Sequence, residues 1–174
     1  MCVAPVMPGQ KLPIDVDTDL TPIANIVGVY NMVVFGKHVP FRTVPELIEQ
    51  AKKNPGKISY ASAGNGTSQH LAGELFQQMT GTKMTHVPYK GSSAMVPDLL
   101  AGTIDIAFDN VPLLLPHART GKLVLLAAAT DKRAEFDPNL PTVAETLPGF
   151  EAVAWHGFFV PAGTPKPVVD RLSG

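Results

Sequence analysis

Short apolar stretches alternate with helix-type patterns over residues 58–129, and this alternation restricts the possible folds more than any other feature of the chain. Apolar runs suited to strands occupy residues 58–61, 84–87, 104–108 and 123–129. Between them, apolar residues recur three or four positions apart in patterns that end near Gly81, Gly102 and Gly121. Strands that alternate with helices form a mainly parallel sheet covered on both faces. We therefore predict a doubly wound α/β domain.

The segments on either side of this region are less regular. Residues 23–35 contain two short apolar runs, which we predict to be strands or strand connectors without an obvious partner. Thr43-Val-Pro-Glu46 and Thr142-Val-Ala-Glu145 each have the spacing of a capping box and predict helix starts. Residues 151–160 are predicted to form a strand, and Thr164-Pro165 starts a final helix of about two turns. We expect a self-contained domain to continue beyond such a helix start.

One strand-to-helix junction has the character of an anion site. Residues 58–71 run from a predicted strand through Gly64 and Gly66 into a helix that Thr67 or Ser68 can cap. Glycine permits a sharp turn and lets a ligand approach the main chain closely. The first N–H groups of a helix lack intrahelical partners and favour negative charge. The pattern predicts a carboxylate or phosphate site, although an ordinary capped turn has the same pattern.

Composition excludes several classes of partner. The chain has 14 basic and 15 acidic residues, a net charge of −1 and no basic block, so nucleic acid and membrane surfaces are not expected as partners. The 45% apolar content, in stretches that Gly or Pro interrupts, predicts a soluble globular protein. Residues 1–12 lack the apolar segment of a secretion signal, which by itself favours the cytoplasm.

We expect no metal and no cofactor. Cys2 is the single cysteine, so neither an intrachain disulfide nor a cysteine-based metal site is predicted. The five histidines are scattered and none has the spacing of a metal-binding helix. A dinucleotide-binding fingerprint would require glycine at the position of Gln69.

A second group of candidate residues follows the predicted strand at 104–108. Ligands of parallel sheets gather at the carboxyl ends of strands. Asp109 is therefore a candidate acceptor for a polar or ammonium group of a ligand, or for a bridging water. We expect Asn110 to cap the helix that follows. Lys90, after another predicted strand, could attract an anion, although a solvated lysine fits as well.

Two further residues, His70 and Trp155, favour structural roles over functional ones. His70 could help to hold an anion, but we expect it to pack against a neighbouring loop. Trp155 could form a cleft wall, but we expect a core position. Ser68, His70 and Asp109 nominally supply a catalytic triad; however, side chains two apart at a helix start point away from each other, and a Gly-x-Ser-x-Gly elbow is missing from the sequence. We predict no catalytic residues.

Seven segments follow one another in the order of a known family: Leu20-Thr-Pro-Ile23, Asn54-Pro-Gly-Lys57, Ser62-Ala-Gly-Asn-Gly-Thr-Ser-Gln-His-Leu-Ala-Gly-Glu-Leu75, His86-Val-Pro-Tyr-Lys-Gly91, Phe108-Asp-Asn110, Leu140-Pro-Thr-Val-Ala-Glu145 and Pro161-Ala-Gly-Thr-Pro165. In these segments the chain resembles the Bug family, the solute receptors of tripartite tricarboxylate transporters. The resemblance extends from about residue 12 to the end, and so many ordered matches are more specific than one glycine-rich loop.

The resemblance implies a periplasmic binding protein of type II, with two α/β lobes joined by crossing strands that close over a small carboxylate or dicarboxylate. Membrane components of the tripartite transporter would be its partners. Because members of the family are longer, it implies a partial chain: residues 1–41 as a remnant of lobe one and a crossing strand, residues 42–153 as lobe two, and residues 154–174 as the returning strand with the start of a lobe-one helix.

The family's lobe two holds one ligand carboxylate with the loop at residues 63–68. This implies backbone and hydroxyl donors at Ala63, Gly64, Asn65, Gly66, Thr67 and Ser68. Two alternatives remain, namely a truncated lobe that binds weakly or not at all, and a small α/β hydrolase. Strands left uncovered by a missing lobe could pair between copies, so a homodimer or domain swap is also considered.

Overall fold

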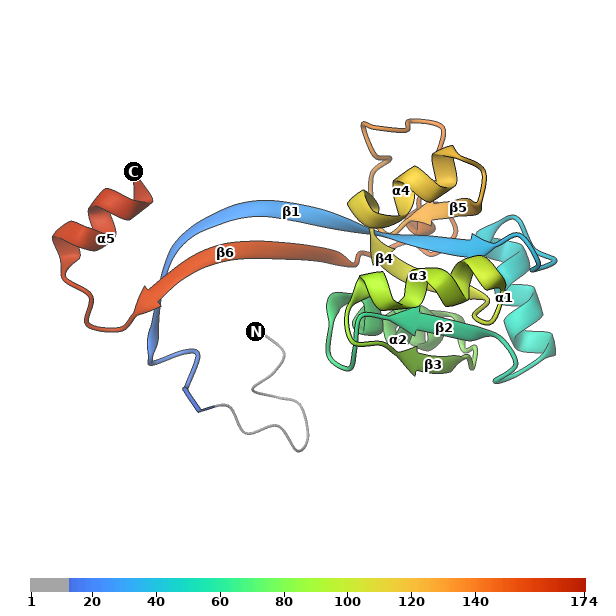
Figure 1. The fold of residues 1–174 in the computed structure, drawn as a ribbon, viewed down its shortest axis with the longest axis horizontal. Helices are drawn as coiled ribbons and strands as arrows, with labels where there is room; N and C mark the ends of the chain where they lie inside the picture. Colours follow the sequence, from blue (N-terminus) through green and yellow to red (C-terminus); the bar gives the residue numbers. More distant parts are fainter. Residues whose placement is uncertain (1–12) are drawn as a thin grey trace. The chain divides into compact units, whose positions relative to one another are not determined.

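The computed structural model describes residues 13–174, and its chain divides into two compact units (Figure 1). The larger unit comprises Val29–Ala154, and the smaller unit combines residues 13–28 with Trp155–Gly174. Residues 1–12, on which the interpretations of Cys2 and of a secretion signal depend, lie outside the described residues.

Strands and helices alternate through the middle of the chain, as predicted. Their order is β1 (Leu20–Gly36), α1 (Val44–Lys53), β2 (Ser59–Ser62), α2 (Ser68–Thr80), β3 (Thr85–Pro88), α3 (Ser92–Ala101), β4 (Ile106–Asn110), α4 (Val111–Arg119), β5 (Leu123–Ala128), the 3-10 turn η2 (Val143–Glu145), β6 (Val153–Pro161) and α5 (Lys166–Ser173). The predicted α/β class is confirmed.

The sheet of the larger unit has the strand order β3-β2-β4-β1-β5. β2 is parallel to β3 and β4, whereas β1 is antiparallel to both β4 and β5. The four strands β2 to β5 therefore run in one direction, and their carboxyl ends lie at one edge. The sequence pattern did not reveal β1, a single strand of 17 residues where we expected two short runs.

Helices cover both faces of this sheet. On one face, Val33 and Phe35 of β1 pack in a core cluster with Leu47 of α1 and Phe76 of α2. On the other face, β1 contributes Met32 and Val34 to a cluster that includes residues of α3 and α4. Because side chains alternate across a strand, one run of apolar residues fills both cores.

The two predicted capping boxes form differently. Thr142 and Glu145 exchange both bonds of the box, but they begin only the short turn η2. At α1, the Thr43 hydroxyl accepts the N–H of Glu46 at 3.3 Å, while the Glu46 carboxylate accepts the N–H of Arg42 instead of that of Thr43. At α1 the bond from the Glu46 carboxylate therefore reaches the residue before the N-cap instead of the N-cap itself.

The smaller unit is a two-stranded ribbon with a short helix. β6 pairs with β1, and the Ala162 N–H donates to the Asp19 carbonyl at 2.7 Å near the end of the ribbon. All of its residues between 13 and 28 and between 155 and 174 are exposed or half-buried. Since β1 also gives Val29–Gly36 to the larger unit, that unit begins before the predicted boundary at residue 42. The assignment of these parts to two lobes stays a prediction.

No helix among residues 13–174 is long and apolar enough to cross a membrane.

Gly73 offers a test of the packing between α2 and the sheet. A Cβ atom at Gly73 would lie 2.3 Å from the buried ring of Tyr60. We expect Gly73→Ala to lower the free energy of unfolding by about 2 kcal/mol, because a methyl group overpacks this contact. Urea unfolding followed by circular dichroism measures the change.

Gly149→Ala is the control, because it adds a methyl group in open space at a positive φ of 88°, at a cost of about 1 kcal/mol. A Gly73→Ala protein as stable as the wild type would contradict the packing of Tyr60 against α2.

Candidate functional site

The carboxyl edge of the sheet brings the predicted site residues together. The glycine loop (residues 63–68) follows β2, Lys90 follows β3, and Asp109 and Asn110 end β4. Because β2, β3 and β4 are parallel, α2, α3 and α4 all begin at this edge. Three helix N-termini there favour negative charge.

The glycine loop adopts a conformation that only glycine adopts readily. Gly64 has a φ of 135° and Gly66 a φ of 76°. A Cβ atom on Gly64 would also lie 3.3 Å from the carbonyl oxygen of Tyr89. The Gly91 N–H donates to the Ala63 carbonyl at 3.1 Å, which ties the loop to the segment after β3. The two glycines are therefore required by the turn itself.

Several donors of the glycine loop are already engaged within it. The Gly64 N–H donates to the Ser62 hydroxyl at 3.2 Å, and the Gly66 N–H donates to His70 Nδ1 at 3.1 Å. Thr67 is the N-cap of α2: its hydroxyl donates to the Gly64 carbonyl at 2.7 Å and accepts the N–H of His70 at 3.4 Å. These groups hold the loop in shape; the cap at Thr67 was expected, whereas the bonds of the Gly64 and Gly66 N–H groups were not.

Other donors of the loop have no acceptor among the described residues. The N–H groups of Asn65, Ser68 and Gln69 make no hydrogen bond within residues 13–174. Asn65 is exposed, and Ser68 is half-buried with its hydroxyl 3.3 Å from the Gln69 side-chain oxygen. These three N–H groups lie at and beside the positive end of α2, where an anion is stabilised.

His70 does pack beside a loop, as expected, but the loop is its own. Its ring also stacks on His86 of β3, with ring centres 4.1 Å apart and planes 16° apart. Burial lowers the pKa of His86, and charge on His70 lowers it further. No local pattern indicates this pair, because 16 positions separate the two histidines.

Asp109 is fully buried and only half satisfied. Its Oδ1 accepts bonds from the Gln69 amide at 3.0 Å and the Ser92 hydroxyl at 2.8 Å. Its Oδ2 has no partner among residues 13–174. Burial raises the pKa of the Asp109 carboxyl, against the opposing effect of the bonds from Ser92 and Gln69 and of the nearby Asn110 backbone N–H. An unpartnered buried acceptor favours a donor at this position.

The expected capping role of Asn110 is wrong. Asn110 is the N-cap residue of α4, but its side chain makes no capping bond, and its buried Oδ1 lacks a partner among the described residues. Asn31, opposite Asn110 on β1, has the same unpartnered Oδ1, while its amide donates to the Ala152 carbonyl at 3.0 Å. Sequence reasoning missed Asn31, although a polar residue before a run of four apolar ones is a signal.

The remaining candidates make no observed contact with the glycine loop or Asp109. Lys90 follows β3 at the same edge of the sheet and is exposed, as expected of a solvated lysine. The core position expected for Trp155 is wrong, because this residue belongs to the smaller unit and is 47% exposed. Ser68, His70 and Asp109 each bond to other groups and not to one another, so the structure does not assemble the nominal triad.

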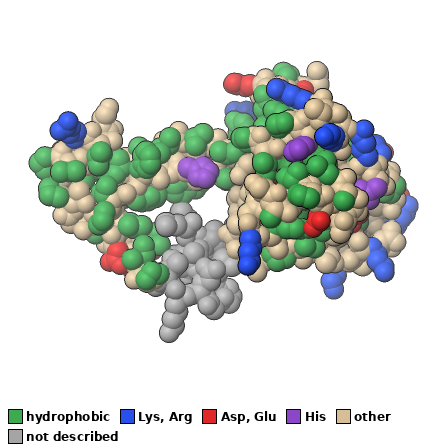
Figure 2. Space-filling view, viewed as in Figure 1, with side chains coloured by type: hydrophobic (Ala, Val, Ile, Leu, Met, Phe, Trp, Pro, Cys, Tyr) green, Lys and Arg blue, Asp and Glu red, His purple; other side chains and the backbone are tan. Residues whose placement is uncertain are grey.

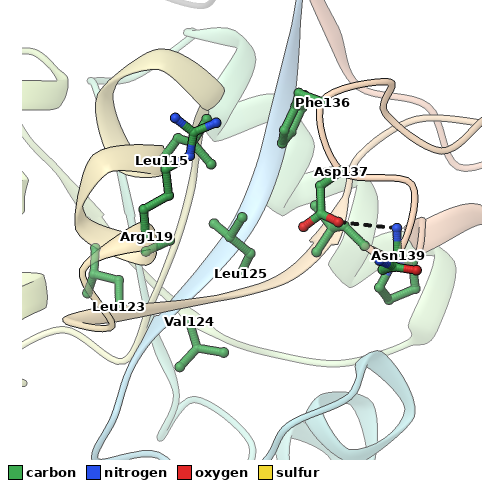
Figure 3. A pocket seen from close by; sticks show the side chains of 11 residues that line it. Leu115, Arg119, Leu123, Val124, Leu125, Phe136, Asp137 and Asn139 are labelled. Carbon is green, nitrogen blue, oxygen red and sulfur yellow. Dashed lines mark hydrogen bonds between the residues drawn. The ribbon is translucent and has the colours of Figure 1, made fainter.

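A separate pocket of about 450 Å³ lies between α4 and the loop after β5 (Figure 3). Leu115 and Arg119 of α4 form one wall, and Phe136 and Asp137 stand on the other side. Leu125 belongs to its floor. No predicted site residue lines this pocket, and among residues 13–174 no cluster of His, Cys, Asp and Glu could hold a metal ion.

Known proteins are similar to this chain in sequence and in fold. The model of the tripartite tricarboxylate transporter family receptor matches residues 1–174. Protein BugT of Bordetella pertussis is 36% identical over 164 residues, which cover 94% of this chain and 50% of BugT. The chain thus spans about half the length of the curated relatives it matches.

Two similar solved structures are named with a ligand. Rpa4515 of R. palustris with adipate is 37% identical with a TM-score of 0.88, covering 94% of this chain and 55% of that one. MatC (Rpa3494) from Rhodopseudomonas palustris with bound malate is 27% identical with a TM-score of 0.86, covering 98% of this chain and 57% of that one. Sequence and fold lead to one conclusion: the chain belongs to the receptor family of tripartite tricarboxylate transporters.

Proposed function

We propose that this chain captures a small dicarboxylate as the receptor, or as part of the receptor, of a tripartite tricarboxylate transporter. The main support is the set of N–H groups without acceptors at the start of α2, on a loop held in shape by its own bonds. Adipate and malate, named with the two similar structures, are both dicarboxylates. Capture without chemistry also agrees with the dispersed nominal triad.

The proposed ligand site comprises the glycine loop and Asp109, each with a distinct role. The N–H groups of Asn65 and Ser68 would donate to one carboxylate of the ligand, together with the N–H of Gln69. Charge-assisted bonds of this kind contribute about 1.5–3 kcal/mol each. Ala63, Gly64, Gly66 and Thr67 would shape the cradle. Asp109 Oδ2 would accept a bond from a hydroxyl or ammonium group of the ligand, or from a water that bridges to it.

Partners and location follow from the family. Members of this family are periplasmic receptors, and we propose the same compartment and the transporter's membrane components as partners for this chain. Since the chain spans about half of its relatives, one lobe would supply only part of the donors. A lobe that binds weakly is therefore the second candidate, and affinity separates it from the first.

The exposed apolar surface of the smaller unit supports a homodimer or a domain swap. Figure 2 shows hydrophobic side chains over β1 and β6, and Trp155, Phe158 and Phe159 are 47%, 66% and 38% exposed. A two-stranded ribbon without a covered face is marginally stable in water. We propose that a second copy covers it.

Two substitutions of Ser68 distinguish its backbone N–H from its hydroxyl as the donor to the ligand. Because Ser68 is the first residue of α2, proline is compatible with the helix there and removes the N–H. We expect Ser68→Pro to weaken adipate or malate binding at least about tenfold through the loss of one charge-assisted bond. Ser68→Ala, which keeps the N–H, should bind nearly as well as the wild type.

Isothermal titration calorimetry with adipate, malate and other C4 to C8 dicarboxylates measures these affinities. Equal binding by Ser68→Pro and the wild type would argue against the assigned donors. Absence of binding by the wild type at millimolar ligand would favour the weakly binding lobe.

The free energy of unfolding of Asp109→Asn tests the cost of burying the ionised Asp109 carboxyl. The pKa of Asp109 is raised in the folded state, so its ionised form is destabilising above that pKa, and this penalty decreases as the pH falls towards the unfolded value near 3.8. We expect Asp109→Asn to be more stable than the wild type at pH 7, with a gain that narrows in acid. Urea unfolding at several pH values measures it, and exposed Asp131→Asn is the control. A gain independent of pH would contradict this account.

The oligomeric state tests the apolar ribbon. We expect size-exclusion chromatography with light scattering to give twice the mass of the 18.5 kDa chain. Phe158→Asp should shift the protein towards the monomer, because it places a charge in the covered face. Met79→Asp, at an exposed apolar residue of α2, is the control. A monomeric wild type at tens of micromolar would refute the dimer.

A further inference from the structure

The aromatic rings of Tyr60, His86 and His70, from three different elements, form a stack. The His86 ring of β3 stacks on Tyr60 of β2, with centres 4.8 Å apart and planes 23° apart, and also on His70 of α2 at 4.1 Å. Tyr60 is fully buried, and its hydroxyl donates to Glu74 at 2.5 Å. Gly73, where a Cβ would meet the Tyr60 ring, allows α2 to approach this closely. The His70 ring is therefore held by its stack on His86, which in turn stacks on the buried Tyr60 of the sheet.

Both imidazoles connect to a glycine N–H of the loop. His86 Nε2 lies 2.7 Å from the Ser62 hydroxyl, which accepts the Gly64 N–H at 3.2 Å. His70 Nδ1 accepts the Gly66 N–H directly at 3.1 Å. A glycine-rich turn would be expected to offer both of these N–H groups to a ligand, but the Gly66 N–H is engaged by His70 and the Gly64 N–H by the Ser62 hydroxyl that contacts His86.

The bond from Gly66 fixes the protonation of His70. A nitrogen that accepts an N–H carries no proton, so neutral His70 has its proton on Nε2, which lies 3.9 Å from the Glu74 carboxylate. Protonation at Nδ1 would bring two N–H groups face to face and remove the acceptor for Gly66.

We propose that His70 is a positioning residue of the glycine loop, holding the Gly66 N–H through Nδ1 while its stack on His86 holds the ring. The N–H groups of Asn65, Ser68 and Gln69 then remain as the ligand-facing donors. The effect on ligand affinity rests on the proposed function, whereas the effect on the loop does not.

The charged and titratable groups that face His70 come from each element packed against it. They are His86 on β3 and Glu74 on α2 itself, and Tyr60 on β2 stacks on the other side of His86. The pKa of Tyr60 is raised by burial, then by its bond to Glu74, so this phenol stays neutral near pH 7. Burial lowers the pKa of His86 and keeps it neutral at pH 8. The ring stack is therefore best studied at pH 8, where Tyr60 and His86 are both neutral.

Two substitutions of His70 distinguish the effect of its Nδ1 acceptor from the effect of its stacked ring. His70→Phe keeps a flat ring for the stack but removes the acceptor. His70→Asn loses the ring, but its Oδ1 can accept at the place of Nδ1 and does not titrate. NMR-detected hydrogen exchange of the Gly66 amide at pH 8 reports the bond directly, and the Ala72 amide within α2 reports whether the fold is intact.

We expect the Gly66 amide to exchange at least about tenfold faster in His70→Phe and at nearly the wild-type rate in His70→Asn. Unchanged exchange in His70→Phe, or equally fast exchange in both variants with Ala72 protected, would overturn the proposal.

Adipate affinity at pH 8 tests the consequence for binding. We expect about tenfold weaker binding in His70→Phe and near wild-type binding in His70→Asn. Equal affinity of His70→Phe and the wild type would refute a role in positioning the ligand. If the wild type binds no dicarboxylate, the proposed function fails, and the Gly66 amide alone decides whether His70 positions the loop.

Discussion

The structure of the larger unit depends on the burial of one stretch of β1. Met32, Val33, Val34 and Phe35 are fully buried, and they alternate between the two cores of the sheet. The same stretch pairs antiparallel with β4 on one side and β5 on the other. Since β4 and β5 have no direct pairing with each other in the sheet order, β1 is the strand that joins them. Without it, β5 would be separated from β4, the strand whose end carries Asp109 and Asn110.

Local patterns predicted much of this arrangement. The strands of the parallel part and their helices follow the sequence period closely, because each element buries one defined face. The glycine loop was recognisable because positive φ at Gly64 and Gly66 leaves few alternatives to glycine. Cap residues such as Thr67 act within three positions, so their bonds could also be inferred from the sequence.

What could not be predicted depends on long-range contacts. The antiparallel pairing of β1 joins residues more than 70 positions apart, and apolar residues at 23–35 have no local signature of that partner. Asn110 has the residue type and position of a cap, yet its side chain makes no capping bond. The stack of Tyr60, His86 and His70 similarly requires three elements to meet, and no spacing within one element indicates it.

The distribution of satisfied and unsatisfied polar groups gives the site its chemical character. Within residues 13–174, donors without acceptors gather at and beside the start of α2, whereas Asn31, Asp109 and Asn110 each present one side-chain oxygen without a donor. Gln69 connects the two sets, because its backbone N–H belongs to the first and its side-chain amide is bonded to Asp109. Buried polar groups are normally satisfied, so each set favours the opposite kind of group. A carboxylate that also carries a hydroxyl or ammonium group, or that binds with an ordered water, would satisfy both sets at once.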